Sequence, residues 1–156
     1  MRAVTFLDTS VLCELVGAPG RCQRGEEITA EFGRRVRAGE RFVVPITAVI
    51  ETGNHIAQAS GDRRSAAERL VRLLRAAAEG KPPFALNEVT WNAEFTGELC
   101  GGNSTEQSFV DLAGNGLMGA GDVAVLVERD GYVARTSLAR SQVGIWTLEA
   151  VLDSYS

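Results

Sequence analysis

The amino-acid sequence predicts an α/β domain with a mostly parallel central sheet. Short runs of apolar and β-branched residues alternate along the chain with longer stretches of helical spacing, which is typical of parallel sheets with helical crossovers. The chain has 156 residues, of which 45% are hydrophobic and 23% charged, as in ordinary globular proteins. No repeat, low-complexity tract or linker divides the sequence, so we expect one domain over residues 1–156.

The first part of the chain predicts two strands, each followed by helices. A first strand is expected at residues 3–7, where AVTFL is followed by polar residues. Helical spacing covers residues 11–16 and 26–38, and a glycine closes each of these stretches. The run FVVPI at residues 42–46 predicts the next buried strand, and Thr47 is expected to cap the helix that follows.

The rest of the chain predicts more helix than strand. Helices are expected at residues 61–80, 89–99, 108–131 (with a break around 114–116) and 148–152. Strands are expected at residues 84–86, 132–134 and 143–146. The first of these three strands is predicted to lie at an edge of the sheet.

The composition excludes several classes of protein. Asp and Glu number 20 against 16 Lys and Arg, and the formal net charge of −4 excludes a strongly basic nucleic-acid coat protein. Cys13, Cys22 and Cys100 are too widely spaced for a zinc site or a disulfide framework, which favours a reducing cytoplasm. The apolar run before Asp8 is too short for a secretory signal, and no run reaches the roughly 20 residues that span a bilayer. We expect a soluble cytoplasmic protein with no membrane contact.

Three acidic residues lie at junctions between predicted elements. Asp8 directly follows the first strand, Glu51 lies one turn into the helix after the second strand, and Asp122 begins a late helix. Singly, Asp8 is also explained as an N-cap and Asp122 as a first-turn acid. Parallel sheets bind ligands at the carboxyl ends of their strands, and carboxylates that converge there repel one another unless cations neutralise them. Bound Mg²⁺ or Mn²⁺ would favour hydrolysis of phosphodiesters.

Four segments of the chain resemble PIN-domain ribonucleases, including toxins of the VapC type. The first is TFLDTSVL at residues 5–12, a strand that ends in an acid. PITAVIE at residues 45–51 is similar to the second acidic motif of the family, and LMGAGDVA at residues 117–124 to the third. GIWTLE at residues 144–149 is similar to the last strand. The resemblance spans nearly the whole chain in the expected order.

The resemblance implies a structure and an activity. The family folds as a three-layer α/β/α sandwich around a parallel sheet. Its acidic pocket, here Asp8, Glu51 and Asp122, binds Mg²⁺ or Mn²⁺ and carries the catalytic residues that cleave RNA. In bacterial toxin–antitoxin pairs a protein antitoxin inserts a segment near this pocket, and the family also suggests a homodimer.

The sequence departs from the family in one feature. The family has a further acid after its fourth strand, in a Thr-x-Asp pattern, whereas residues 132–140 contain no carboxylate. Thr136 or Ser137 is expected to orient a water there, and Asp111 is a possible substitute for the acid. A catalytically weakened enzyme, or an inactive PIN-fold RNA-binding or scaffold protein, is therefore the alternative to an active nuclease.

Other polar residues near the acids have two interpretations each. Thr9 and Ser10 either cap a helix or orient a water or phosphate in the site. His55, four residues after Glu51, is either a general base or metal ligand or a structural histidine.

The arginines of the second predicted helix also have two interpretations. They either contact the RNA backbone or form a solvated helix face. The residues concerned are Arg34, Arg35 and Arg37. A further arginine cluster at residues 63–75 is interspersed with glutamate, which favours the solvated face.

Two other α/β classes also begin with a strand that ends in aspartate. A phosphatase of the haloacid-dehalogenase type needs a second aspartate where this chain has Ser10. A phosphorylation receiver needs a lysine after a late strand, whereas the sole lysine, Lys81, follows a predicted helix. Neither class fits the sequence.

Overall fold

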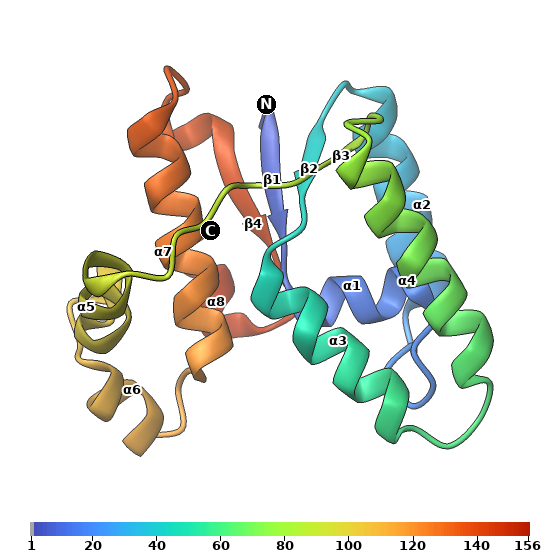
Figure 1. Cartoon of the computed structure of the whole chain (residues 1–156), viewed down its shortest axis with the longest axis horizontal. Coiled ribbons are helices and arrows are strands. Elements are labelled where there is room, and N and C mark those ends of the chain that lie inside the picture. Colours follow the sequence, from blue (N-terminus) through green and yellow to red (C-terminus); the bar gives the residue numbers. More distant parts are fainter. Residues whose placement is uncertain (1) are drawn as a thin grey trace.

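A four-stranded parallel sheet forms the centre of the molecule. The computed structural model describes residues 2–156 and gives the strand order β3-β2-β1-β4, with every pair parallel. The strands are β1 (Val4–Leu7), β2 (Arg41–Val43), β3 (Phe84–Ala85) and β4 (Val143–Trp146). Helices cover both faces of the sheet (Figure 1), which confirms the α/β class and the three layers that the resemblance implies.

The first four helices pack on one face of the sheet. They are α1 (Thr9–Val16), α2 (Gly25–Arg37), α3 (Ile46–Gln58) and α4 (Arg63–Ala78). Leu7, Phe42 and Trp146 from three strands enter the same apolar cluster as the buried residues of these helices. Because these side chains are almost fully buried, this cluster is one of the two halves of the core.

The later helices pack on the opposite face. They are α5 (Ala93–Gly101), α6 (Phe109–Gly114), α7 (Ala120–Arg135) and α8 (Ala150–Asp153), with short 3₁₀ turns at Asn103–Thr105 and Arg140–Gln142. Phe6 and Ile145 point from the sheet into this second apolar cluster and meet Leu126 of α7. Neighbouring residues of β1 thus face opposite clusters, as expected of a strand buried on both faces.

The structure corrects three of the predicted elements. Residues 132–134 are the last turns of α7 rather than a strand, and the Tyr132 ring packs edge-on against Phe6, 5.6 Å between centroids. The second strand ends at Val43, and Pro45 rather than Thr47 is the N-cap of α3. The helix predicted from residue 89 begins at Ala93, because Asn92 caps it through the Phe95 N–H.

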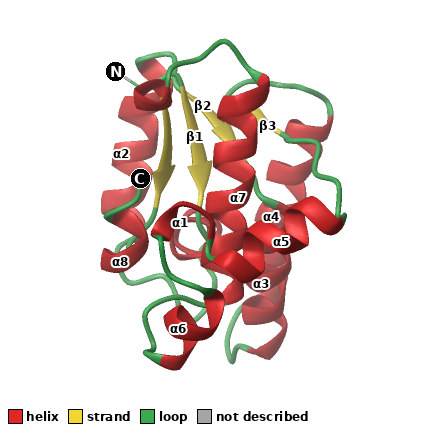
Figure 2. Ribbon diagram, turned by 90° about the vertical axis from the view of Figure 1, so that its left-hand side faces the viewer, coloured by secondary structure: helices red, strands yellow, loops and turns green. Residues whose placement is uncertain are grey.

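The carboxyl ends of β1, β2 and β4 lie at the same edge of the sheet. The β1 arrow points toward α1 (Figure 2), and α3 begins three residues after β2 ends. The segment that follows β4 starts at the same edge, because Leu7 pairs with Trp146 in the β1–β4 register. In the described part of the chain, no helix is long and apolar enough to cross a membrane.

Candidate functional site

Asp8 lies at the end of the central strand β1 and is 3% exposed. Its Oδ2 atom accepts hydrogen bonds from the hydroxyl groups of Ser10 (2.7 Å) and Thr147 (2.8 Å). The Ser10 N–H also reaches Oδ2, at 3.3 Å, as a helix cap. All three bonds end on one oxygen, so the other oxygen, Oδ1, is left free of them. The N-cap and site interpretations of Asp8 are therefore compatible.

Glu51 lies between two elements that fix its carboxylate. Thr9 donates a hydrogen bond from its hydroxyl group to Oε2, 2.6 Å away. On the other side the carboxylate lies against the backbone of Gly121, where a Cβ atom would stand 2.8 Å from Cδ of Glu51. A side chain at position 121 would therefore displace the carboxylate. This close approach of α3 to α7 could not be read from the sequence.

Asp122 lies in the first turn of α7, where its Oδ2 accepts the N–H of Gly119 at 3.0 Å. Burial raises the pKa of this carboxyl group from 3.8 to about 6. The Gly119 hydrogen bond opposes the rise, and the negative charges of Asp8, Glu51 and Glu149 add to it. The acids of the site are therefore near enough to repel one another, which is the electrostatic condition that a cation would relieve.

One pocket brings these side chains together at the carboxyl edge of the sheet. Its volume is about 510 Å³. It is lined by Asp8, Thr9, Ser10, Cys13, Glu14, Gly20, Arg21, Gln23, Glu51, His55, Asp122, Leu148 and Glu149. The three acids predicted from the sequence therefore line one cavity, together with Thr9, Ser10 and His55.

The prediction that no carboxylate follows the fourth strand is wrong. It took residues 132–134 as that strand, whereas the fourth strand is residues 143–146 and the segment after it reads Thr147-Leu148-Glu149. Thr147 donates to Asp8, and its hydroxyl oxygen accepts the Glu149 N–H at 3.0 Å. A threonine followed two residues later by an acid is thus present, with glutamate in place of aspartate.

The residues that the sequence predicts for that position do not line the pocket. Thr136 is the C-cap of α7, and Ser137 follows it in a turn. Asp111 lies on α6, where its carboxylate accepts the Ser108 hydroxyl group at 2.7 Å. None of the three is among the lining residues.

The arginines of α2 are not among the lining residues either. Arg34 and Arg35 form ion pairs with Glu31 on the same helix, and the Arg35 guanidinium lies 4.2 Å from the centre of the Trp146 ring. Arg37 ends the same helix. Their contact with RNA stays a prediction.

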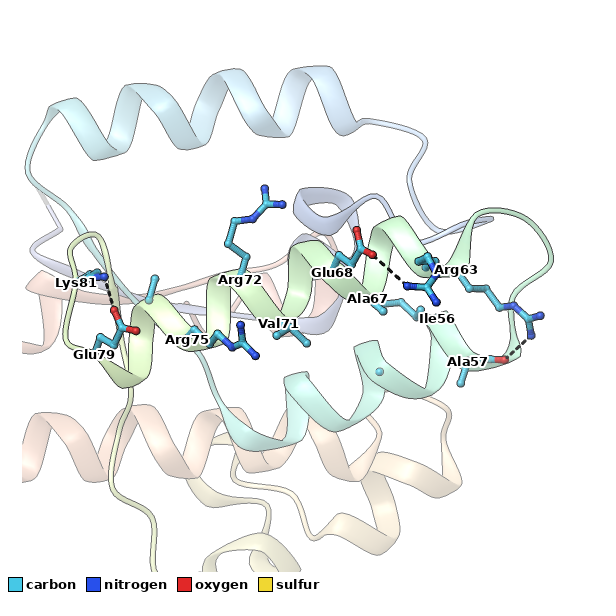
Figure 3. A pocket seen from close by; sticks show the side chains of 13 residues that line it. Ile56, Ala57, Arg63, Ala67, Glu68, Val71, Arg72, Arg75, Glu79 and Lys81 are labelled. Carbon is cyan, nitrogen blue, oxygen red and sulfur yellow. Dashed lines mark hydrogen bonds and ion pairs between the residues drawn. The ribbon is translucent and has the colours of Figure 1, made fainter.

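A separate and larger groove between α3 and α4 is lined by four arginines of the second cluster, Arg63, Arg64, Arg72 and Arg75. Its volume is about 1150 Å³, and Ile56, Ala67 and Val71 form apolar parts of its wall. Arg72 and Arg75 extend from α4, as Figure 3 shows. No lining residue is shared with the acidic pocket. The two cavities are therefore separate.

The donor set of the acidic pocket fits a hard divalent cation. Carboxylate and hydroxyl oxygens are the ligands that Mg²⁺ and Mn²⁺ prefer, and the raised pKa of Asp122 reflects burial together with unrelieved like charge. Across residues 2–156, however, no three His, Cys, Asp or Glu side chains are already arranged to hold one ion. Glu51 is turned toward Thr9, and Asp122 toward Gly119. A bound cation would therefore have to draw these carboxylates inward.

A comparison with family models, curated proteins and solved structures finds no match for this chain. The resemblance to PIN-domain ribonucleases thus depends on the motifs and on the residues that the fold brings together.

Proposed function

We propose that this protein is a metal-dependent endoribonuclease that hydrolyses RNA phosphodiester bonds with the help of Mg²⁺ or Mn²⁺. The observation that carries the proposal is the pocket at the carboxyl edge of the sheet, in which Asp8, Glu51 and Asp122 converge from three separate elements. Ligand sites of parallel sheets lie at this edge. A site of several carboxylates and few basic groups is suited to a cation that is shared with a phosphate.

The side chains of the pocket have distinct tasks in this proposal. Asp8, Glu51 and Asp122 would hold the cation, with Glu149 as a fourth acid at the rim. When bound, the cation would supply charge neutralisation at the phosphate and would make a nearby water a better nucleophile. Ser10 and Thr147 hold Asp8 through its Oδ2 atom, which leaves Oδ1 free of their hydrogen bonds.

Thr9 orients the Glu51 carboxylate through the hydrogen bond that its hydroxyl group donates, at 2.6 Å. His55 lies on the same face of α3, lines the pocket and is half-buried. The proposal assigns no proton transfer to His55, because the nucleophile is a water that a cation held by the three acids would activate.

We further propose that the protein acts in the cytoplasm as the toxin of a type II toxin–antitoxin pair. The support is the resemblance of the four motifs, together with three free cysteines of the kind found in a reducing compartment. The expected partners are an RNA substrate, a protein antitoxin and a second copy of the chain. Light scattering of the purified protein would distinguish a homodimer from a monomer.

The experiment that tests the nuclease proposal is an RNA cleavage assay with matched variants. Purified protein is incubated with RNA in Mn²⁺, in Mg²⁺ and in EDTA, and each reaction is repeated with Asp8→Asn and Glu149→Gln. Glu94→Gln, an exposed acid on α5, is the control. We expect cleavage only with metal, a loss of at least about a hundredfold for Asp8→Asn, a smaller loss for Glu149→Gln and full activity for the control.

The alternative function is an inactive PIN-fold RNA-binding or scaffold protein. The argument for this alternative is the missing fourth acid. Because Glu149 lines the pocket, that argument is weaker. Equal amounts of RNA breakdown in Mn²⁺, in EDTA and with Asp8→Asn would reject the nuclease and favour this alternative.

A further inference from the structure

The loop between α1 and α2, residues 17–24, forms one wall of the acidic pocket. Gly20, Arg21 and Gln23 of this loop are among the lining residues. Arg21 is exposed, and it is the only lysine or arginine among the described residues that line the pocket. The other ionisable side chains there, apart from His55 and Cys13, are the five acids Asp8, Glu14, Glu51, Asp122 and Glu149.

This loop is held in place by a buried carboxylate. Glu14, on α1, is 7% exposed, and its two oxygens accept the backbone N–H groups of Gln23 (3.2 Å) and Arg24 (2.9 Å). The Cys22 thiol donates to the backbone carbonyl of Glu14 at 3.5 Å. The backbone N–H of Arg21 donates to the backbone carbonyl of Ala18 at 2.9 Å. Glu14 is thus occupied by the loop, which distinguishes it from the acids proposed to hold the cation.

Arg24, in the same loop, has an acidic partner, whereas Arg21 has none among the described residues. Arg24 forms an ion pair with Glu27 at 2.6 Å. No ion pair of Arg21 with an acid occurs within residues 2–156. An unpaired guanidinium beside a pocket of carboxylates remains available to a ligand that carries its own negative charge.

We propose that Arg21 binds a phosphate of the RNA strand beside the acids, and that Glu14 is the positioning residue that holds its loop. The inference rests on the proposed function and adds a substrate contact to it. A pocket with five carboxylates repels a polyanion, and a bound cation offsets only part of that charge. A guanidinium at the rim supplies a bidentate phosphate contact on the side of the pocket formed by the loop.

The test measures RNA binding separately from cleavage. The parent protein carries Asp122→Asn to prevent hydrolysis, and its affinity for a fluorescent single-stranded RNA is measured in Mg²⁺ over a series of salt concentrations. We expect Arg21→Ala to weaken binding about tenfold and to reduce the slope of log affinity against log salt by about 0.7. Arg41→Ala is the matched control, because Arg41 is an exposed arginine at the opposite edge of the sheet.

A second pair of variants tests the role of Glu14. Glu14→Ala is expected to weaken RNA binding less than Arg21→Ala does, and the double variant should bind no more weakly than Arg21→Ala alone. If Glu14 affected binding only through the general structure and not through Arg21, the losses in affinity of the two single variants would add in the double variant. Because Glu14→Ala removes the buried carboxylate that holds this exposed loop, thermal unfolding is recorded beside binding so that only folded proteins are compared.

The outcomes separate this inference from the proposed function. Unchanged affinity and salt slope for Arg21→Ala, equal losses for Arg21→Ala and Arg41→Ala, or no RNA binding by the parent would each overturn the inference. If the wild-type protein cleaves no RNA while the parent binds it through Arg21, the nuclease proposal fails and the phosphate contact stands.

Discussion

At the scale of single residues, Gly121 connects two elements of the site. The Glu51 carboxylate occupies the place where a side chain at position 121 would begin. The absence of a Cβ atom lets the first turn of α7 approach α3 closely enough for Glu51 and Asp122 to share a pocket. In the proposed enzyme this glycine is a positioning residue, since it touches a ligand acid rather than the substrate.

Gly121→Ala is expected to separate activity from stability. The added methyl group displaces Glu51, so metal-dependent RNA cleavage should fall by at least about tenfold, while the helix gains up to roughly 1 kcal/mol from its intrinsic preference for alanine. Gly97→Ala in α5, where the space is open, is the control and should leave cleavage unchanged. The readouts are cleavage rate in Mn²⁺ and thermal unfolding. Full activity of Gly121→Ala would contradict the assigned role.

Asp122 makes the stability of the metal-free protein depend on pH. Its pKa of about 6 in the folded chain exceeds the ordinary 3.8, so between these values the folded state keeps a proton that the unfolded state has lost. Stability therefore falls as the pH rises from about 4 to 6, and the full penalty is present above that window. At lower pH the carboxyl group is protonated in both states and the effect disappears.

Asp122→Asn is accordingly expected to stabilise the protein at neutral pH. Allowing for solvent screening of this half-buried group, the gain in unfolding free energy in EDTA should be about 1 kcal/mol at pH 7 and close to zero at pH 4. Urea unfolding at the two pH values measures this gain in unfolding free energy. Asp153→Asn, at an exposed position, is the control. An equal gain at both pH values would show that titration is not the cause.

The sequence predicted some site residues and missed others for identifiable physical reasons. Asp8 and Glu51 could be predicted because each follows a buried strand at a fixed short distance. Glu149 was missed because the sequence predicts a fourth strand at residues 132–134, which belong to α7, and only a later strand at residues 143–146, which is in fact the fourth. The roles of Gly121 and Arg21 depend on the approach of segments distant in sequence, which no local pattern contains.

At the scale of elements, the sequence predicts a strand where the structure has the end of α7. Tyr132-Val133-Ala134 has strand-forming residues, yet it continues a helix of 16 residues. Tertiary packing outweighs the local preference, because the Tyr132 ring packs edge-on against Phe6 of the central strand and Val133 packs against the second apolar cluster. Strand β1 and helix α1 were predicted closely because their local patterns and their packing agree.

Arg129 links α7 to the end of the chain. Its side chain is fully buried, and its Nη2 atom donates to the carbonyl of Tyr155 at 2.9 Å. It also forms an ion pair with Asp130, which is paired with Arg140 as well. The remaining atom, Nη1, is buried and has no hydrogen-bond partner in the described part of the chain. Much of the contribution of Arg129 is therefore expected to come from the volume that it fills rather than from its charge.

Two substitutions of Arg129 separate the contribution of its packing from that of its charge. Arg129→Ala is expected to lower the free energy of unfolding by about 3 kcal/mol, through a cavity and lost hydrogen bonds, and Arg129→Met should recover most of the loss. Urea unfolding of the two variants checks the expectation. Equal destabilisation by both would show that the charged contacts, and not the packing, carry the stability.

At the scale of the whole molecule, the fold class could be predicted because strands and helices alternate along the chain. The proposed cation should couple the separate elements of the site, because it would bind acids from α3, α7 and the end of β1 at once. Such binding stabilises only the folded state.

Mn²⁺ at about a hundred times its dissociation constant is expected to raise the unfolding free energy by about 2.7 kcal/mol, or roughly 5–10 °C in Tm for a chain of this size. Asp8→Asn should abolish the shift, and Glu94→Gln should keep it. Differential scanning calorimetry in Mn²⁺ and in EDTA provides the measurement. A shift of the same size in Asp8→Asn would place the ion elsewhere on the protein.

The pairing of β1 with β4 has a consequence for biosynthesis. The Asp8 N–H bonds to the carbonyl of Trp146 at 3.0 Å, and its carboxylate accepts the Thr147 hydroxyl group, 139 positions later in the chain. A ribosome therefore makes the first acid of the site early and its supporting strand late. While β4 is still inside the exit tunnel, the nascent chain lacks both the strand and the hydroxyl group that orient Asp8. The pocket is assembled only after translation has passed residue 149.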